Sequence, residues 1–150
     1  MAHNFKKIGT GFLLAACLAA CSSPPPITAG IGVSARLVDQ QLLSESTFDN
    51  EELAELLAIT SVKGKQTNGF LQGNVQLKNK DGYTQTLQYQ FTWFDEQGYI
   101  VEAESQAWKP LELHGGQEKS LVGIAPSPQA KSFKFYVREA HKRAYEFDGN

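Results

Sequence analysis

The chain has 150 residues, a formal net charge of −2 and two cysteines, and each value excludes a class of protein. The length corresponds to a single domain, and a pI near 5.9 lacks the basic excess of a nucleic-acid-binding protein. An apolar content of 41%, with nine Phe and five Tyr residues, argues against intrinsic disorder. Two cysteines can form neither a disulfide-rich scaffold nor a four-thiolate zinc site.

The N-terminal segment has the organisation of a secretory signal peptide. Lys6 and Lys7 precede an uncharged, apolar stretch over residues 8–20. Its 13 residues are too few for a membrane-spanning helix, which needs about 20, but they match the hydrophobic core of a signal peptide. We therefore expect residues 1–20 to be removed and residues 21–32 to form a flexible tether.

The stretch Leu18-Ala19-Ala20-Cys21 resembles the lipobox of bacterial lipoproteins. The resemblance implies that a diacylglyceryl group joins the Cys21 sulfur, that the chain is cut between Ala20 and Cys21, and that acyl chains such as palmitate anchor the new N-terminus. Ser22 follows, and in the sorting rule of this motif serine directs the lipoprotein to the outer membrane. We therefore expect a lipid anchor on the periplasmic face of that membrane, with membrane lipid as its contact.

A second cysteine repeats the pattern four residues earlier, in Leu14-Ala15-Ala16-Cys17. Modification of Cys17 would leave an apolar core of only nine residues and a mature chain that starts with further apolar residues. Cys21 is followed by two serines and three prolines, which make a polar, semi-rigid tether. We favour Cys21 and keep Cys17 as the alternative.

The mature chain has to fold without a disulfide. It keeps 130 residues with 12 basic and 16 acidic side chains, a formal charge of −4, and its only cysteine is Cys21. Apolar burial must therefore supply the stability, and a domain of about 110 residues is large enough for that.

The predicted elements begin with a first edge strand over residues 33–38. Asp49 stands three residues before Glu52, which is the spacing of a capping box. Three leucines after it share one helical face, so the sequence predicts a short helix over residues 50–57.

From residue 58 onward the apolar period is two, which is typical of strands. The clearest strand covers residues 87–93, and it is followed by a hairpin turn and a returning strand over 99–105. Other strands are predicted over residues 71–77, 110–113, 119–124 and 133–137, with a tail at 139–150. About seven short strands separated by turns predict an all-β, antiparallel two-sheet sandwich over residues 33–138. We expect Trp93 to fill the core space that a disulfide occupies in antibody domains.

Three segments together resemble the YcfL-like family of small bacterial envelope lipoproteins. They read GFLQGNVQLKN, LQYQFTWFDEQGYIV and WKPLELHGGQEKSLVGIAPSPQAKSFKFYVR. The resemblance implies an immunoglobulin-like sandwich and an outer-membrane lipoprotein with no assigned activity. It also implies an association with peptidoglycan synthesis, since members are often encoded beside a lipoprotein that activates a penicillin-binding protein. The segment 33–57 resembles the family less.

The sequence contains no arrangement of residues that is typical of catalysis or metal binding. We interpret His114 as a solvated turn residue, because no acid or second histidine lies beside it at ligand spacing. His141 is followed by Lys142 and Arg143, so we interpret it as a solvated residue of a basic tail. Glu102 and Glu104 are expected on one face of a strand. The acidic group Asp49, Glu51, Glu52 and Glu55 is expected to interact favourably with the partial positive charge at the helix N-terminus. We therefore expect no enzyme, no metal and no cofactor.

Trp108 is the remaining candidate site residue. It is either an exposed aromatic contact for a partner or a plug between the sheets. The favoured hypothesis is a noncatalytic protein-binding or scaffold module of the cell envelope, whose partner belongs to the penicillin-binding protein machinery; nucleic acid is not expected. The alternative is a small-ligand carrier or an enzyme with a cleft between the sheets. The sequence leaves the oligomeric state open.

Overall fold

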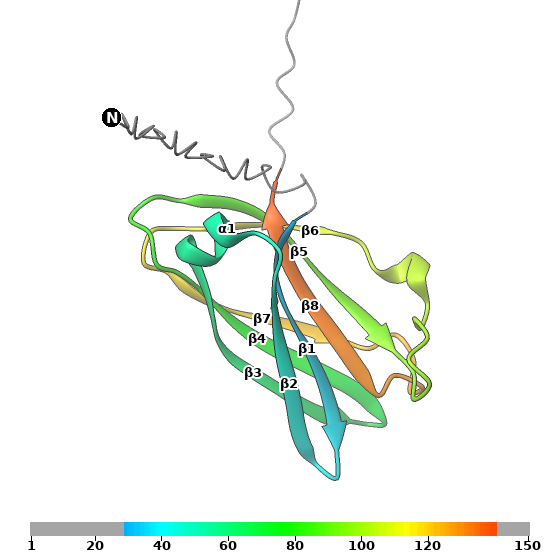
Figure 1. Ribbon diagram of the computed structural model, residues 1–150. Helices are drawn as coiled ribbons and strands as arrows, with labels where there is room; N and C mark the ends of the chain where they lie inside the picture. The colour runs from blue at the N-terminus through cyan, green and yellow to red at the C-terminus, as the bar shows by residue number, and fades with distance from the viewer. Residues whose placement is uncertain (1–28, 141–150) are drawn as a thin grey trace, which may run out of the picture.

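Two antiparallel sheets face each other in the computed structural model, which describes residues 29–140 (Figure 1). The strands are β1 (Gly30–Val38), β2 (Gln41–Phe48), β3 (Leu57–Thr67), β4 (Phe70–Asn79), β5 (Gln85–Phe94), β6 (Lys109–Leu113), β7 (Glu118–Ile124) and β8 (Ser132–Glu139). The helices are α1 (Glu51–Leu56) and the short 3-10 helix η1 (Ala103–Ser105). One sheet has the order β2-β1-β8-β5-β6 and the other β3-β4-β7, which confirms the predicted all-β sandwich. Within the described residues no helix is long and apolar enough to cross a bilayer.

The strand order follows the Greek key of an immunoglobulin domain with one replacement. β3, β4 and β7 take the positions of strands A, B and E, and β5, β6 and β8 those of C, C′ and F. The position of strand G, beside F, is filled by β1 from the N-terminal side of the chain. β2 then extends this sheet by one more strand. In Figure 1 the first strand lies beside the last, so the start of β1 and the end of β8 meet at one end of the sandwich.

The first strand begins earlier than predicted. Residues 30–32, which were expected in the tether, belong to β1, and Ile31 is fully buried. The two glycines beside Ile31 look like linker residues, but a Cβ at Gly32 would lie 2.6 Å from the Tyr136 ring. These glycines are therefore part of the folded domain, where the lack of a side chain lets the Tyr136 ring pack against β1. The prediction also missed β2, whose side chains are mostly exposed and polar and show no apolar period.

The strand predicted over residues 99–105 is wrong. Only Ile100 forms an isolated bridge, to Phe94, and Glu102 then adopts a left-handed backbone with φ +47 before η1 begins. β6 occupies this edge of β5 only along Gln85–Tyr89. Beside the end of β5, the segment adds only the Ile100 bridge and a hydrogen bond from the Val101 N–H to the Trp93 carbonyl. Glu102 and Glu104 consequently do not share a strand face.

The predicted helix is confirmed, but its cap differs from the prediction. The Asn50 side chain accepts the backbone N–H of Leu53 at 3.0 Å, so Asn50 is the N-cap and Asp49 is not. Asn is as good an N-cap as Asp because its side-chain oxygen satisfies the same free backbone donor. At the other end of the domain, Glu139 still belongs to β8, and residues 141–150 lie outside the described part.

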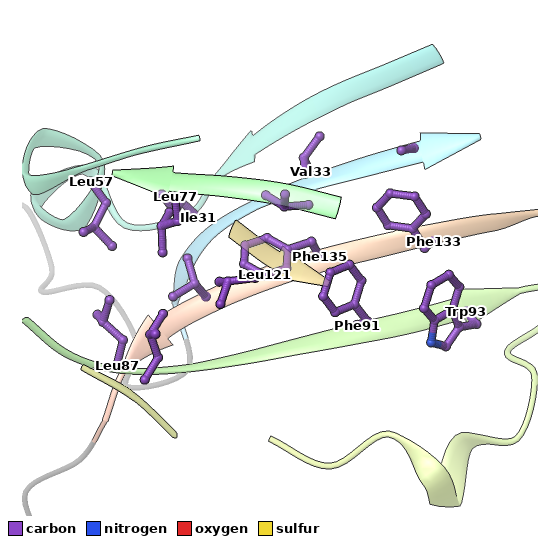
Figure 2. Close-up of a cluster of buried hydrophobic side chains, with 14 of the residues drawn as sticks. Ile31, Val33, Leu57, Leu77, Leu87, Phe91, Trp93, Leu121, Phe133 and Phe135 are labelled. Atoms are coloured by element: carbon purple, nitrogen blue, oxygen red, sulfur yellow. The ribbon is translucent and has the colours of Figure 1, made fainter. Parts of the chain in front are cut away.

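An aromatic cluster fills the space between the sheets (Figure 2). Trp93 is 3% exposed, which confirms its predicted place in the core. Its ring stacks on Phe91 with centroids 5.7 Å apart and lies 5.5 Å from Phe133. Such aromatic pairs each contribute about 0.5–1.5 kcal/mol beyond their area burial.

The rings of Phe133 and Phe91 pack against two glycines of the three-stranded sheet. Gly73 of β4 and Gly123 of β7 are direct cross-strand partners. A Cβ at Gly73 would lie 2.8 Å from the Phe133 ring, and one at Gly123 would lie 2.7 Å from the Phe91 ring. The contact of Gly73 with Phe133 joins the same two strands, B and F, that the disulfide joins in antibody domains. Ring packing on a side-chain-free surface thus takes the place of a covalent link.

Asn79 is a buried polar side chain that ties together the loops at one end of the sandwich. Its amide donates to the carbonyls of Tyr83 at 2.7 Å and Leu113 at 2.9 Å, and the residue is fully buried. It also donates to the His114 carbonyl and accepts the N–H of Asp81. Every polar atom of this amide group therefore has a partner, which makes its burial tolerable.

We expect alanine at Gly73 or Gly123 to lower the free energy of unfolding by about 1–3 kcal/mol, because the added methyl overpacks the core against an aromatic ring. Gly82 is the matched control, since a Cβ there meets nothing within 4 Å. Urea denaturation of the three variants tests this. Equal stability of all three would contradict the described packing.

Replacement of Asn79 by alanine should be costly, because it removes the donor to the buried Leu113 carbonyl and to the partly buried carbonyls of Tyr83 and His114. The expected loss is about 2–4 kcal/mol of unfolding free energy. Asn74→Ala is the control, since Asn74 is only partly buried and its side chain accepts a single bond, from the Ser120 hydroxyl. Thermal and urea denaturation should separate the two variants clearly.

Candidate functional site

Aromatic and cationic side chains gather on the outer face of the five-stranded sheet. Alternate residues of β8 point away from the core, and Gln88 and Gln90 of β5 lie opposite two of them in the register. The group consists of Trp108, Lys134, Tyr136, Arg138, Gln88 and Gln90, and we call it the Trp108 face.

The segment before β6 places Trp108 over this face. The Gln90 side chain donates to the backbone carbonyl of Gln106, and the Gln106 side chain donates to the Val101 carbonyl at 2.6 Å. These bonds hold the chain against the outside of β5 just before β6 pairs with it at Lys109. Trp108 is half-buried there, so its predicted alternative role as a plug between the sheets is wrong.

Arg138 lies over the face of the Trp108 indole. Its guanidinium carbon is 3.8 Å from the ring centroid. Its Nε and one terminal nitrogen both donate to the Gln88 side-chain oxygen at 3.3 Å. The ring and the amide fix the guanidinium in place, and both are neutral, so the charge of Arg138 is positioned without being cancelled by them.

Tyr136 connects the face to the beginning of the domain. Its hydroxyl accepts the backbone N–H of Gly30 at 2.8 Å and donates to the Asp49 carboxylate at 2.8 Å. Burial, together with the hydrogen bond and charge of Asp49, raises the pKa of Tyr136 above its ordinary value of 10.0. The ring also packs edge-on toward Trp108, with centroids 6.3 Å apart, and carries the Lys134 ammonium 5.1 Å from its centre.

The other candidate site residues from the sequence do not lie together in one site. His114 is exposed, and its Nδ1 lies 3.1 Å from the Thr84 hydroxyl. Glu51 and Glu52 occupy the first turn of α1, as expected, while Asp49 is engaged by Tyr136. Among residues 29–140 no three His, Cys, Asp or Glu side chains are arranged to hold a metal ion.

Several predicted sites lie outside the described residues. These are Ala20, Cys21 and Ser22 of the lipobox, the alternative Cys17, and His141.

The surface also has a groove of about 530 Å³ between the β1–β2 hairpin and the three-stranded sheet. Leu42, Lys63, Lys65 and Gln72 are among the residues that line it. Neither tryptophan contributes to this groove, so it gives no support to a carrier site at Trp93 or Trp108.

Sequence reasoning found Trp108 but missed its partners. The alternation of β8 indicated that Lys134, Tyr136 and Arg138 share a polar face. Their meeting with Trp108 depends on β5 lying between β6 and β8, and no local pattern encodes that order.

Comparison with known proteins gives one family. The family described as "Protein of unknown function (DUF1425)" matches residues 44–139. A crystal structure of a DUF1425 family member from Shewanella sp. pv-4 is 32% identical, with a TM-score of 0.53 over 69% of this chain and 87% of that one. The crystal structure of Campylobacter jejuni Cj0090 is 19% identical, with a TM-score of 0.48 over 55% of this chain and 85% of that one. No curated protein matches the chain.

The raised pKa of Tyr136 predicts a specific dependence of stability on alkaline pH. The folded state holds the phenol proton more tightly than the unfolded state, so this stabilisation is complete below pH 10 and is lost as pH rises through the folded-state pKa. Tyr136→Phe should cost about 1–2 kcal/mol near neutral pH, through two lost hydrogen bonds. Above pH 10 the difference between the two proteins should shrink, as measured by urea denaturation across that range. A constant difference would contradict the prediction.

Proposed function

This chain belongs to the DUF1425 family, and from that premise we propose that it is a YcfL-like lipoprotein of the outer membrane. In this proposal Cys21 carries the lipid anchor and the sandwich stands in the periplasm. The Trp108 face binds another protein of the cell envelope, and the protein has no catalytic activity of its own. The partner class that we propose is the penicillin-binding protein machinery of peptidoglycan synthesis.

The lipobox supports the anchor. Several acyl chains, each contributing about 0.8 kcal/mol for every buried CH₂ group, would make the attachment effectively permanent. Nine residues lead from Cys21 to Gly30, where β1 begins. Because an extended chain spans at most about 3.3–3.6 Å per residue, the proposed tether keeps the start of the sandwich within roughly 30 Å of its lipid.

The stacking of Arg138 on Trp108 carries the proposal of protein binding. A tryptophan on the outside of a sheet leaves a large aromatic surface outside the core, and Trp, Tyr and Arg are the residues that most often dominate binding energy in interfaces. All three occur together here, held by hydrogen bonds to the neighbouring strand and to the segment before β6. A rigid surface loses little conformational entropy when a partner binds.

The arrangement of the titratable side chains also favours binding over catalysis. A catalytic site needs a base and a nucleophile or a second acid within hydrogen-bond reach. The histidine at position 114 meets a threonine hydroxyl in a solvated turn, and Glu102 and Glu104 are exposed in and before η1.

Mass spectrometry of the mature N-terminal peptide tests the anchor. We expect acyl chains on Cys21 and a chain that starts at that residue. Cys21→Ala should abolish lipidation and release the protein from the outer-membrane fraction. Acyl chains on Cys17 would contradict the assignment.

Photo-crosslinking in cells tests the binding surface. A benzoylphenylalanine introduced in place of Trp108 should crosslink to an envelope protein. The same probe in place of Val122, which is 44% exposed on the outer face of the other sheet, is the matched control. Identical crosslinks from both positions, or none from position 108, would count against the proposal.

A further inference from the structure

We propose that Arg138 and Lys134 form a binding site for two carboxylates of an extended, acidic segment of a partner protein. This inference rests on the proposed function and specifies the chemistry of the partner at the Trp108 face. It is carried by the way both cations are held over aromatic rings on one side of β8.

The side chain of Arg138 is held in place by the neutral groups of Gln88 and Trp108, and neither of them supplies a carboxylate. Its guanidinium has five N–H donors, of which Gln88 takes the Nε proton and one proton of a terminal nitrogen. The indole contacts the guanidinium carbon, and the remaining N–H donors are not used by these contacts. A charged donor that is already oriented forms a strong, directional bond to a carboxylate because less rotamer entropy is lost on binding.

Lys134 gives the site its second contact and a defined spacing. It lies four residues before Arg138 on the same strand, so the two positions face the same side. With a rise of about 3.3–3.4 Å per residue, they are about 13 Å apart along β8. An extended segment has the same rise, so acidic residues four positions apart in the partner would reach both cations at once.

The surrounding surface favours an acidic partner. The outward positions of β1, beside β8, are Gly30, Gly32, Ser34 and Arg36. Those of β5, on its other side, are Gln88, Gln90, Thr92 and Phe94. These central strands therefore present no carboxylate on this side. Of the nearby acids, Asp49 is engaged by the Tyr136 hydroxyl, and Glu45 and Glu112 lie on the edge strands β2 and β6.

A protein segment suits this face better than an anionic membrane surface. The end of the sandwich where β1 begins lies next to the proposed tether, and there Asp49 donates its backbone N–H to the Gly30 carbonyl. Glu51, Glu52 and Glu55 of α1 follow directly. Arg138 lies opposite Gly30 at this end, so an anionic membrane that approached it would also meet these acids and be repelled. An extended protein segment can instead lie along the sheet from Arg138 to Lys134.

Fluorescence anisotropy with the purified lipoprotein in nonionic detergent tests the inference. The probe is a fluorescein-labelled serine/threonine peptide with two glutamates four residues apart, and the same peptide with glutamines is its control. We expect binding of the glutamate peptide only, weakened by added salt. Arg138→Gln and Lys134→Gln should each reduce the affinity by about tenfold.

Lys63→Gln is the matched protein variant, since it removes one exposed charge from the other sheet and should leave the affinity unchanged. Thermal melting confirms that each variant is folded, and Lys134→Gln still tests the site if Arg138→Gln destabilises the domain. Equal loss in all three variants, or equal binding of the glutamine peptide, would overturn the inference. So would binding of phosphatidylglycerol vesicles that depends on the same two cations while the peptide does not bind.

The crosslinking experiment separates failure of this inference from failure of the proposed function. If position 108 crosslinks to an envelope protein but the glutamate peptide does not bind, the acidic chemistry is wrong and the protein-binding role stands. If neither signal appears, both proposals are wrong.

Discussion

The contact between aromatic rings of one sheet and glycines of the other holds the sandwich together. Phe133 and Phe91 reach across to Gly73 and Gly123, and the absence of a Cβ at the two glycines is what lets the sheets approach. The contact of Phe133 with Gly73 joins the two strands that a disulfide joins in antibody domains. A core held in this way needs no cysteine, and residues 29–140 contain none, which leaves Cys21 free for the proposed lipid attachment.

The same strand that supplies this contact also forms the Trp108 face. Along β8, Phe133, Phe135 and Val137 point into the core, and the residues between them point outward. Because strand side chains alternate, a shift of one residue in the pairing of β8 would bury the cations and expose the phenylalanines. The core therefore fixes the register, and the register fixes which side chains meet Trp108.

The sequence predicted those parts of the structure that have a strong local period. β5 and β8 alternate cleanly and were placed correctly, as was Trp93, whereas β2 has no apolar period and was missed. Residues 99–105 look like a strand, but pairing stops after the Ile100 bridge, and the backbone becomes left-handed at Glu102 before η1. The site was half predicted for the same reason. Trp108 is conspicuous as a residue, but its contact with Arg138 joins positions thirty residues apart through the strand order.

β1 connects the proposed anchor to the proposed binding surface. It lies outside the family match, which begins at residue 44, yet it fills the place of strand G beside β8. Gly30 and Gly32 have no side chain, so the Tyr136 ring can lie against this strand. The Tyr136 hydroxyl accepts the backbone N–H of Gly30, the first residue of the strand. The point where the proposed tether enters the sandwich is thus bonded directly to the Trp108 face. If the proposed anchor holds, the short length of chain between Cys21 and Gly30 would keep a partner bound there close to the membrane, without any further membrane contact from the domain.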